Sequence, residues 1–164
     1  MKILKARKED ARKIAKMRKN TFEKILAKNY TRKVINYLNN QNNPSDFVKK
    51  MKEREMYCAW KDGELVGTVD LEGNKIGGVF VKHDLIGKGI GTKLMDFIEN
   101  KARSKGIKNV KLYPTKFAVG FYKKRGYKTV KRFKWKTPYF SRTSIEMRKR
   151  LKWMDNLILI HSKI

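Results

Sequence analysis

Residues 77–105 read GGVFVKHDLIGKGIGTKLMDFIENKARSK, and this stretch decides the fold. An apolar run over 79–81 leads into a loop with glycine at positions 87, 89 and 91. Apolar side chains then recur at Ile90, Leu94, Phe97, Ile98 and Ala102, which is the spacing of one helix face. The stretch therefore predicts a strand, a glycine-rich loop and a helix.

The junction between this loop and the helix is suited to binding an anion. The first amides of a helix have no intrahelical partner, and the aligned peptide dipoles favour negative charge there. Glycine also allows the backbone to approach a phosphate closely. The spacing differs from G-x-G-x-x-G, and the chain contains no G-x-x-x-x-G-K-[ST] motif, which argues against two common nucleotide-binding folds. A glycine turn that merely joins strand to helix is the alternative.

The six residues Ile86–Gly91 resemble the acyl-coenzyme A loop of the GNAT superfamily of N-acetyltransferases, whose pattern is [QR]-x-x-G-x-[GA] directly after a strand. Ile86 departs from the pattern, because it offers no side-chain donor to the pyrophosphate. The resemblance implies acetyl-CoA as co-substrate. It assigns cofactor binding to residues in the strand, the loop and a later helix: Val79, Phe80, Val81, Ile86, Gly87, Lys88, Gly89, Ile90, Gly91, Thr92 and Phe121.

A second segment, residues 117–127, reads FAVGFYKKRGY and is similar to the family pattern N-A-x-x-F-Y-x-x-x-G-[FY]. Phe117 stands where asparagine is common. The resemblance implies that Tyr122 is the general acid and that a backbone amide near Val81 contacts the oxyanion. The alternative for Tyr122 is an aromatic core residue. The general base stays open among Asp70, Glu72, His83 and a water chain.

The family resemblance implies an α+β fold, the α/β GNAT fold, over residues 1–150. We expect a mixed, mostly antiparallel central sheet with a splayed parallel strand pair, flanked by helices. Expected strands cover 2–6, 55–61, 65–71, 76–82, 110–113, 127–136 and 143–150. Expected helices cover 9–22, 31–38, 46–53 (capped by Ser45), 90–105 and 117–125. Gly77 and Gly78 inside a strand predict a bulge or a close backbone approach.

The chain is strongly basic, with 42 Lys and Arg against 15 Asp and Glu and a net charge of +27. Such a field attracts nucleotides, nucleic acid and other anions, whereas codon bias in an AT-rich genome would give the same excess. Cys58 is the single cysteine, so an internal disulfide is excluded and a buried apolar role is expected. The two histidines are isolated in sequence, which gives a metal site no support. Because no apolar run is long enough to span a bilayer, we expect a cytoplasmic protein.

The acceptor is expected to bind at residues 22–30 and 136–140, which include Glu23, Tyr30 and Tyr139. These stretches contain few carboxylates, so a polyamine is less favoured than a neutral or anionic small molecule or a protein amine. The prediction is an acyltransferase that moves an acetyl group from acetyl-CoA to a primary amine by direct attack in a ternary complex. The alternative is a GNAT-shaped basic module that binds nucleic acid or ribosomes, with acetylation secondary or lost.

Residues 151–164 form an apolar C-terminal extension with Trp153, Met154 and the run 157–160. Such a segment is rarely left in water. We expect it to pack on its own domain or at a dimer interface, so that both a monomer and a homodimer stay open.

Overall fold

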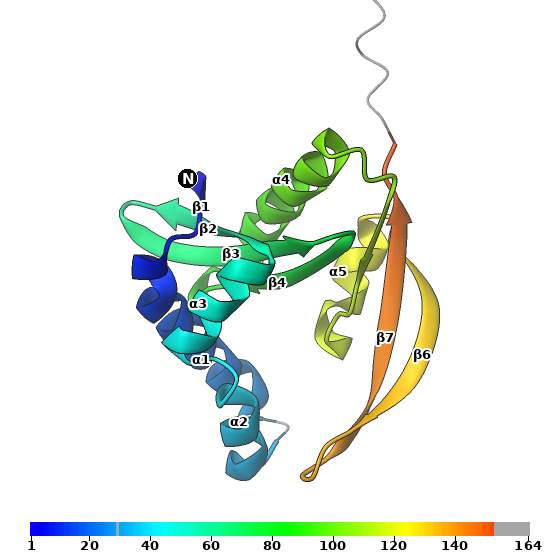
Figure 1. Cartoon of the computed structure of the whole chain (residues 1–164). Coiled ribbons are helices and arrows are strands. Elements are labelled where there is room, and N and C mark those ends of the chain that lie inside the picture. The colour runs from blue at the N-terminus through cyan, green and yellow to red at the C-terminus, as the bar shows by residue number, and fades with distance from the viewer. Residues whose placement is uncertain (29, 153–164) are drawn as a thin grey trace, which may run out of the picture.

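The computed structural model describes residues 1–28 and 30–152, and the predicted packing of the tail from Trp153 onward lies outside the described residues. The described chain forms a seven-stranded sheet with helices on both faces (Figure 1). The elements, in chain order, are β1 (Lys2–Lys5), η1 (Lys8–Asp10), α1 (Ala11–Leu26), α2 (Arg32–Asn39), α3 (Pro44–Glu53), β2 (Glu55–Lys61), β3 (Glu64–Glu72), β4 (Lys75–Val81), η2 (His83–Leu85), α4 (Ile90–Ser104), β5 (Asn109–Leu112), η3 (Lys116–Ala118), α5 (Val119–Lys124), β6 (Lys128–Lys136) and β7 (Ser141–Arg150).

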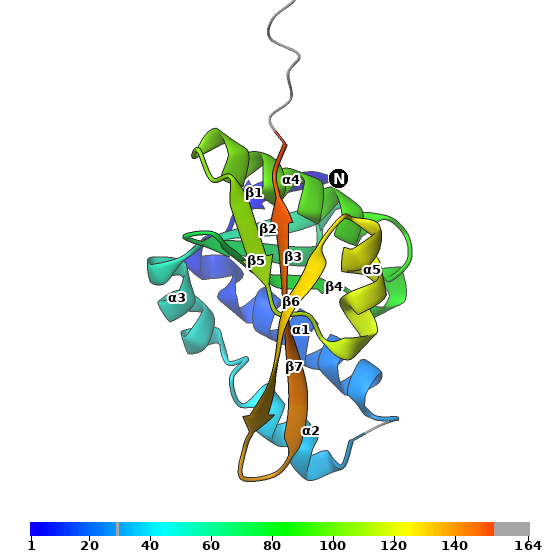
Figure 2. The same cartoon turned by 90° about the vertical axis from the view of Figure 1, so that its right-hand side faces the viewer.

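The sheet order is β1-β2-β3-β4-β5-β7-β6, and the predicted mixed sheet is confirmed. Neighbouring strands are antiparallel except β4 and β5, which are the parallel pair among the described strands. The pairing of β4 with β5 is restricted to Lys75 opposite Lys111, so the two strands diverge beyond that point. The helix α4 makes the connection between them, as a parallel crossover requires (Figure 2).

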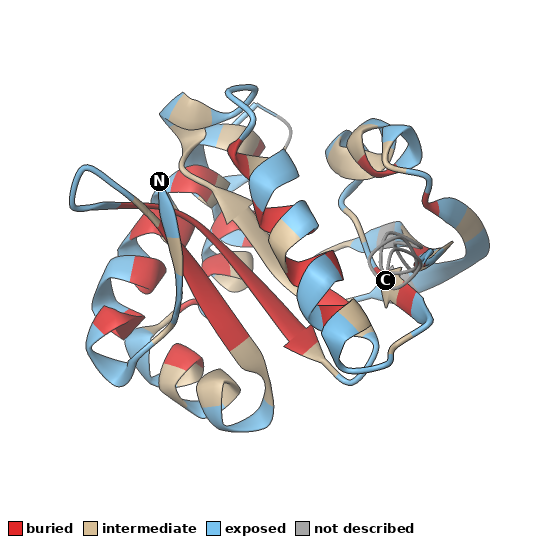
Figure 3. Ribbon diagram, turned by 90° about the horizontal axis from the view of Figure 1, so that it is seen from above, coloured by how far each residue is buried: buried red, intermediate tan, exposed pale blue. Residues whose placement is uncertain are grey.

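Buried residues lie in the sheet and in the helices that cover it (Figure 3), and the apolar ones form two clusters. On one face, Leu94, Met95 and Ile98 of α4 are fully buried in the larger cluster. On the other face, Ile14 of α1 and Phe47 of α3 are fully buried in the second cluster. Within the described chain, no helix combines the length and the apolar character needed to cross a membrane.

The predicted start of α3 was wrong by two residues. The helix begins at Pro44, and its N-cap is Asn43 rather than Ser45. The backbone N–H of Asn43 donates to Oδ2 of Asp46 at 2.9 Å, which is one half of a capping box. Proline suits the first helical position because its missing N–H would have no helical partner there.

The predicted bulge at Gly77 and Gly78 is confirmed. The β3–β4 register runs from Thr68 opposite Phe80 to Asp70 opposite Gly77, so two residues of β4 face one residue of β3. Gly78 has a φ of +56°, a conformation that side chains other than glycine rarely adopt.

A buried cluster of polar groups holds this bulge. Arg18 of α1 is 4% exposed, and its Nη2 donates to the Gly78 carbonyl at 3.0 Å and to Thr68 Oγ1 at 2.9 Å. The Thr68 hydroxyl donates to the same carbonyl at 2.8 Å. Asp70 is 2% exposed and forms an ion pair with Arg54 at 3.5 Å. Burial lowers the pKa of Arg18 to about 10, and the Asp70 carboxylate opposes this shift.

The direction of the Gly78 carbonyl determines where the next amide points. A trans peptide directs its C=O and N–H to opposite sides, so the Val79 N–H points away from Arg18 and Thr68. Farther along β4, Lys82 N–H donates to Val66 O of β3 at 2.9 Å. Because successive residues of a strand direct their amides to opposite sides, the Val81 N–H also points away from β3. The amides of Val79 and Val81 therefore both point away from β3, the neighbour of β4 on its other side from β5.

We expect Gly78→Ala to destabilise the protein more than Gly73→Ala, which is its matched control. Both glycines have a φ of +56°, but a Cβ at Gly73 meets nothing within 4 Å. A Cβ at Gly78 would lie 2.0 Å from Asp70 Oδ2 and 2.6 Å from Arg18 Nη2. The excess loss in free energy of unfolding should be about 1–3 kcal/mol, the usual effect of overpacking a core, and urea unfolding measures it. Equal losses in the two variants would contradict a rigid cluster beneath Gly78.

Candidate active site

A cleft of about 640 Å³ opens where β4 and β5 diverge. One wall is β4 from Ile76 to Val81, together with Phe22, Ile25 and Leu26 of α1. The opposite wall runs from Leu112 at the end of β5 through Thr115 to Tyr122 of α5. The glycine loop lines the cleft as well, so that the loop, the strand pair and α5 share one cavity.

The glycine loop adopts the backbone that the sequence predicts for a strand-to-helix turn. Gly87 and Gly89 have φ values of +84° and +79°, and Gly89 is the N-cap of α4. A Cβ at either position would meet nothing within 4 Å, so the approach to the backbone is open from outside. Since the first amides of a helix lack intrahelical acceptors, the start of α4 presents N–H donors to an anion in the cleft.

Most of the predicted cofactor residues line this cleft: Val79, Phe80, Val81, Ile86, Gly87, Gly89, Gly91, Thr92 and Phe121. Lys88 and Ile90 are not among the lining residues. Lys88 is exposed, whereas Ile90 is 6% exposed and packs in the core cluster beneath the loop. The sequence alone could not show that these two residues face away from the cleft. Which loop residues face it depends on how the loop turns in three dimensions.

Tyr122 is both a cleft residue, as a general acid would be, and a packed aromatic residue of the core. It lines the cleft, yet it is only 6% exposed and its ring makes edge contacts with Phe121 at 5.0 Å and Tyr127 at 5.7 Å. Burial raises the pKa of Tyr122 to about 12. The phenol therefore stays protonated at neutral pH and is available as a hydrogen-bond and proton donor.

The three side chains considered as general bases do not line the cleft. Asp70 is buried behind Gly78, and desolvation raises its pKa. Glu72 forms ion pairs with Arg54 and Lys75 at 3.2 and 3.6 Å. Since His83 lines a separate pocket, none of the three is in position to take a proton from a group in the cleft.

Tyr113 is a cleft residue that the sequence did not single out. It is 42% exposed, and its hydroxyl donates to Glu146 Oε2 at 3.1 Å. A hydrogen bond from Arg148 lowers the pKa of Glu146, so the carboxylate stays charged and holds the phenol. Tyr113 and Tyr122 are the titratable side chains among the described lining residues. The sequence pattern around Glu146 could have indicated its position. Ile145 and Met147 contact the core, so the carboxylate between them lies on the opposite face of β7.

The three predicted acceptor residues come from the last turns of α1, the loop after it and the tip of the β6–β7 hairpin. This tip and α2 lie at the same end of the molecule (Figure 1). Tyr139 contacts Tyr37 of α2 at a ring separation of 5.1 Å, and Tyr30 contacts Phe140 at 6.1 Å. Glu23 forms an ion pair with Arg32 at 3.6 Å. None of the three lines the cleft, so they are not in contact with its interior.

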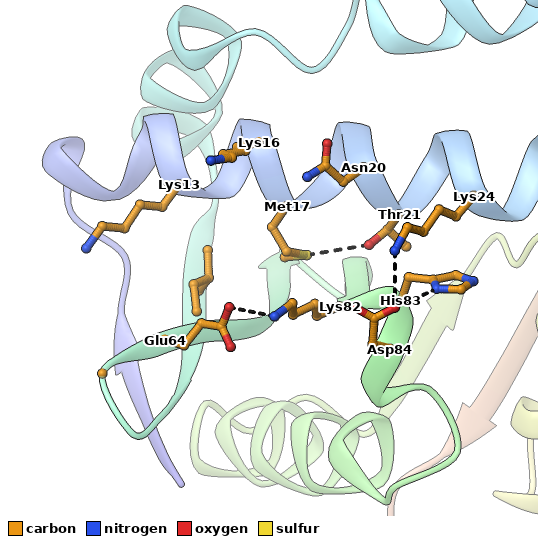
Figure 4. A pocket seen from close by; sticks show the side chains of 12 residues that line it. Lys13, Lys16, Met17, Asn20, Thr21, Lys24, Glu64, Lys82, His83 and Asp84 are labelled. Carbon is orange, nitrogen blue, oxygen red and sulfur yellow. Dashed lines mark hydrogen bonds and ion pairs between the residues drawn. The ribbon is translucent and has the colours of Figure 1, made fainter.

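A second pocket, of about 280 Å³, lies between α1 and the segment around η2 (Figure 4). Four of its charged groups form ion pairs: Lys82 with Glu64 at 2.6 Å, and Lys24 with Asp84 at 3.2 Å. His83 Nδ1 lies 3.1 Å from Asp84 Oδ1. Because both of its carboxylates are already paired with lysines, it is a weaker candidate for chemistry than the cleft.

Comparisons with known proteins agree on one family. The family model for an acetyltransferase (GNAT) domain matches residues 26–136. No curated protein sequence matches the chain.

Among solved structures, a GCN5-related N-acetyltransferase from Rhodopseudomonas palustris superposes with a TM-score of 0.83 at 22% identity, covering 92% of this chain and 95% of that one. The PaiA N-acetyltransferase of Thermoplasma acidophilum, in complex with coenzyme A, gives 0.77 at 20% identity and covers 91% and 98%. An aminoglycoside 6′-N-acetyltransferase complexed with coenzyme A gives 0.68 at 17% identity and covers 93% and 98%. At these identities the superpositions show a shared fold.

The match to the family model spans more than half of the chain, and it contains the strand, the glycine loop and the tyrosine helix around the cleft. The chain therefore belongs to the GNAT family of acetyltransferases.

Proposed function

We propose that the protein transfers an acetyl group from acetyl-CoA to a primary amine by direct attack in a ternary complex. The observation that carries this proposal is the single cleft between β4 and β5, which joins the glycine loop to Tyr122. Family membership supports acetyl transfer, and two structural neighbours are complexes with coenzyme A.

The pyrophosphate of acetyl-CoA is assigned to the start of α4. The loop backbone of Gly87, Gly89 and Gly91 presents N–H donors, and the helix dipole adds partial positive charge. Ile86 gives no side-chain donor, so backbone amides carry the contact. A Cβ at Gly91 would meet Phe121 at 3.6 Å and Val81 at 3.7 Å, which shows how closely the loop packs on both cleft walls.

The pantetheine arm and the thioester are assigned to the β4 wall. The amides of Val79 and Val81 point away from β3, and both residues line the cleft. An amide has a partial positive charge, so the Val81 N–H can stabilise the oxygen that becomes negative during attack. The main-chain groups of Phe80 point to the opposite side, toward β3.

In the reaction, the neutral amine nitrogen attacks the thioester carbonyl carbon. The C–N bond forms, the C–S bond breaks, and the amine loses one proton to water in the cleft. Tyr122 donates its proton to the departing thiolate and regains one from solvent. Burial raises the pKa of Tyr122, and it also raises that of a thiol in the same apolar surroundings, so the proton affinities of donor and acceptor move in the same direction.

A second candidate function is a basic module that binds nucleic acid or ribosomes. The net charge of +27 favours it. The cleft, the glycine loop and Tyr122 serve no purpose in such a module, and for this reason we propose the enzyme first.

Gly89→Ala tests the assignment of the glycine loop, with Gly63→Ala as its matched control. The two glycines have φ values of +79° and +77°, and a Cβ at either meets nothing within 4 Å. Each variant should lose about 1–2 kcal/mol of stability from the left-handed backbone. Only Gly89→Ala should weaken coenzyme A binding, by several-fold or more in calorimetry, because its Cβ stands where the phosphates approach. Equal affinities in both variants would remove the loop from the site.

Tyr122→Phe tests the proton donor, with Tyr127→Phe as its control. The Tyr127 hydroxyl is also buried, but it donates to Glu99 at 3.1 Å and does not line the cleft. In single-turnover assays with acetyl-CoA and an amine, Tyr122→Phe should slow the chemical step by about 10²-fold, the low end for general acid catalysis. Coenzyme A affinity should change little. Tyr127→Phe should lose stability and keep the chemical rate, so the result that would contradict the assignment is an unchanged rate in Tyr122→Phe.

The raised pKa of Tyr122 also predicts the pH profile. The donor is the protonated phenol, which is lost only as pH rises through about 12. A lysine-type acceptor has a pKa of about 10.4, so its reactive neutral fraction increases up to that pH. The single-turnover rate should therefore rise from pH 7 to about pH 10 without an alkaline decline. A decline centred near pH 8–9 that disappears in Tyr122→Phe would show that the phenol titrates far below this range.

A further inference from the structure

Positive and negative charges are unevenly distributed along the chain. Residues 100–145 contain no Asp or Glu and 15 Lys and Arg. The cations are Lys101, Arg103, Lys105, Lys108, Lys111, Lys116, Lys123, Lys124, Arg125, Lys128, Lys131, Arg132, Lys134, Lys136 and Arg142. A compositional preference for lysine raises positive charge everywhere, but it does not remove carboxylates from one continuous segment. The segregation is therefore a property of this part of the fold.

This segment runs from the end of α4 through β5, α5 and β6 to the middle of β7. Its residues between Leu112 and Tyr122 line one side of the cleft. Some of its cations pair with carboxylates from outside the segment, such as Arg125 with Asp96 at 2.6 Å. The cations of β6 are exposed, and no ion pair joins them to a carboxylate in the described part of the chain. Figure 2 shows β6 and β7 extending past the sheet toward α2.

The tip of this hairpin contacts α2 outside the residues that line the cleft, and both sides of the contact are basic. On α2, Lys33 Nζ lies 4.9 Å from the ring centre of Tyr139 at the hairpin tip. Lys134 and Lys136 are exposed on β6 close to the same tip. Glu23 is the one acidic residue between positions 11 and 45, and Arg32 neutralises it at 3.6 Å. A molecule that binds here meets positive charge on both sides.

The phosphates of acetyl-CoA do not account for this charge. Their pyrophosphate is assigned to the glycine loop, whereas the hairpin tip contacts α2 through Tyr139 and Tyr37, away from that loop. Exposed aromatic surface accompanies the cations, since Tyr139 is 45% exposed and Phe133 is 36% exposed. The tip thus offers both charge and apolar contact area to a second ligand.

We propose that the acceptor is a primary amine within an acidic peptide segment, either an N-terminus or a lysine flanked by Asp and Glu, that docks on the β6–β7 hairpin and α2. This inference rests on the acetyl transfer proposed above, because the docked amine is the nucleophile that attacks the thioester. Molecules with several positive charges, such as polyamines, are repelled at the same surface. Nucleic acid matches the charge but carries no aliphatic amine, so the peptide is the occupant that also satisfies the chemistry.

Three peptides that differ only in the residues flanking one reactive amine provide the test: Glu and Asp, Gln and Ser, or Lys and Arg. With acetyl-CoA, kcat/KM measured by thiol release should fall in that order, by roughly 10-fold or more between the acidic and basic peptides. Added salt should reduce the difference, because it screens exposed charges. Equal values for the three peptides, or a preference for the basic one, would overturn the proposal.

Charge variants locate the docking surface. Lys134→Gln/Lys136→Gln should raise KM for the acidic peptide by about 5-fold and leave coenzyme A affinity and kcat near wild type. The control is Lys2→Gln/Lys5→Gln, which removes the same charge from β1 at the opposite edge of the sheet and should leave KM unchanged. If both pairs raise KM equally, the effect is one of net charge and the hairpin assignment is wrong.

Two further measurements test the docking proposal and the acetyl-transfer proposal separately. Coenzyme A binding by calorimetry tests the enzyme proposal, and fluorescence anisotropy of the labelled acidic peptide tests docking without turnover. Binding of the peptide that is lost in the hairpin variant supports docking even if coenzyme A fails to bind. Tighter binding of a mixed-sequence single-stranded RNA, lost in the same variant, would assign the hairpin to nucleic acid and overturn the peptide proposal.

Discussion

The hydrogen bonds that the Gly78 carbonyl accepts from Arg18 and Thr68 fix the geometry on which the cleft depends. In a strand, a shift of one residue exchanges the two faces. The bulge at Gly78 is such a shift, and it is held by donors that come from a different helix and a different strand. With this carbonyl fixed, Phe80 packs toward α1, where its ring lies 5.0 Å from that of Phe22, while Val79 and Val81 pack with the opposite core cluster.

An arginine suits this position better than a lysine. Its guanidinium has several donors in one plane, so it can contact Gly78 and Thr68 together. The same plane lies 4.8 Å from the ring centre of Phe47 and 4.6 Å from that of Phe80. These contacts offset part of the desolvation that lowers the pKa of Arg18. The Arg18 guanidinium is thus fixed by hydrogen bonds in its plane and by aromatic rings against its face. As a result, α1 cannot shift without moving the β4 backbone.

The features that could be predicted from the sequence are those that local rules determine. The glycine loop, the bulge at Gly78 and the helix with Tyr122 each depend on residues close in sequence, and all three were found from spacing and glycine placement. Arg18 could not be found in this way. In sequence it is one cation among the many of a basic helix, and its partners Thr68 and Gly78 are 50 and 60 residues away. The hydrogen bond between Tyr113 and Glu146 spans 33 residues and was missed for the same reason.

Charge is placed around the cleft rather than inside it. The described lining residues include no Lys, Arg, Asp or Glu, and their titratable side chains are the two phenols Tyr113 and Tyr122. An unpaired charge in a narrow apolar cavity would be costly, because the charge would lose its hydration without gaining a partner. Backbone dipoles supply polarity without net charge, and here the directions of the Val79 and Val81 amides follow from the bulge in β4. Arg18 therefore acts from behind the cleft. It orients the β4 backbone while its own charge stays buried among Asp70, Thr68 and the aromatic rings.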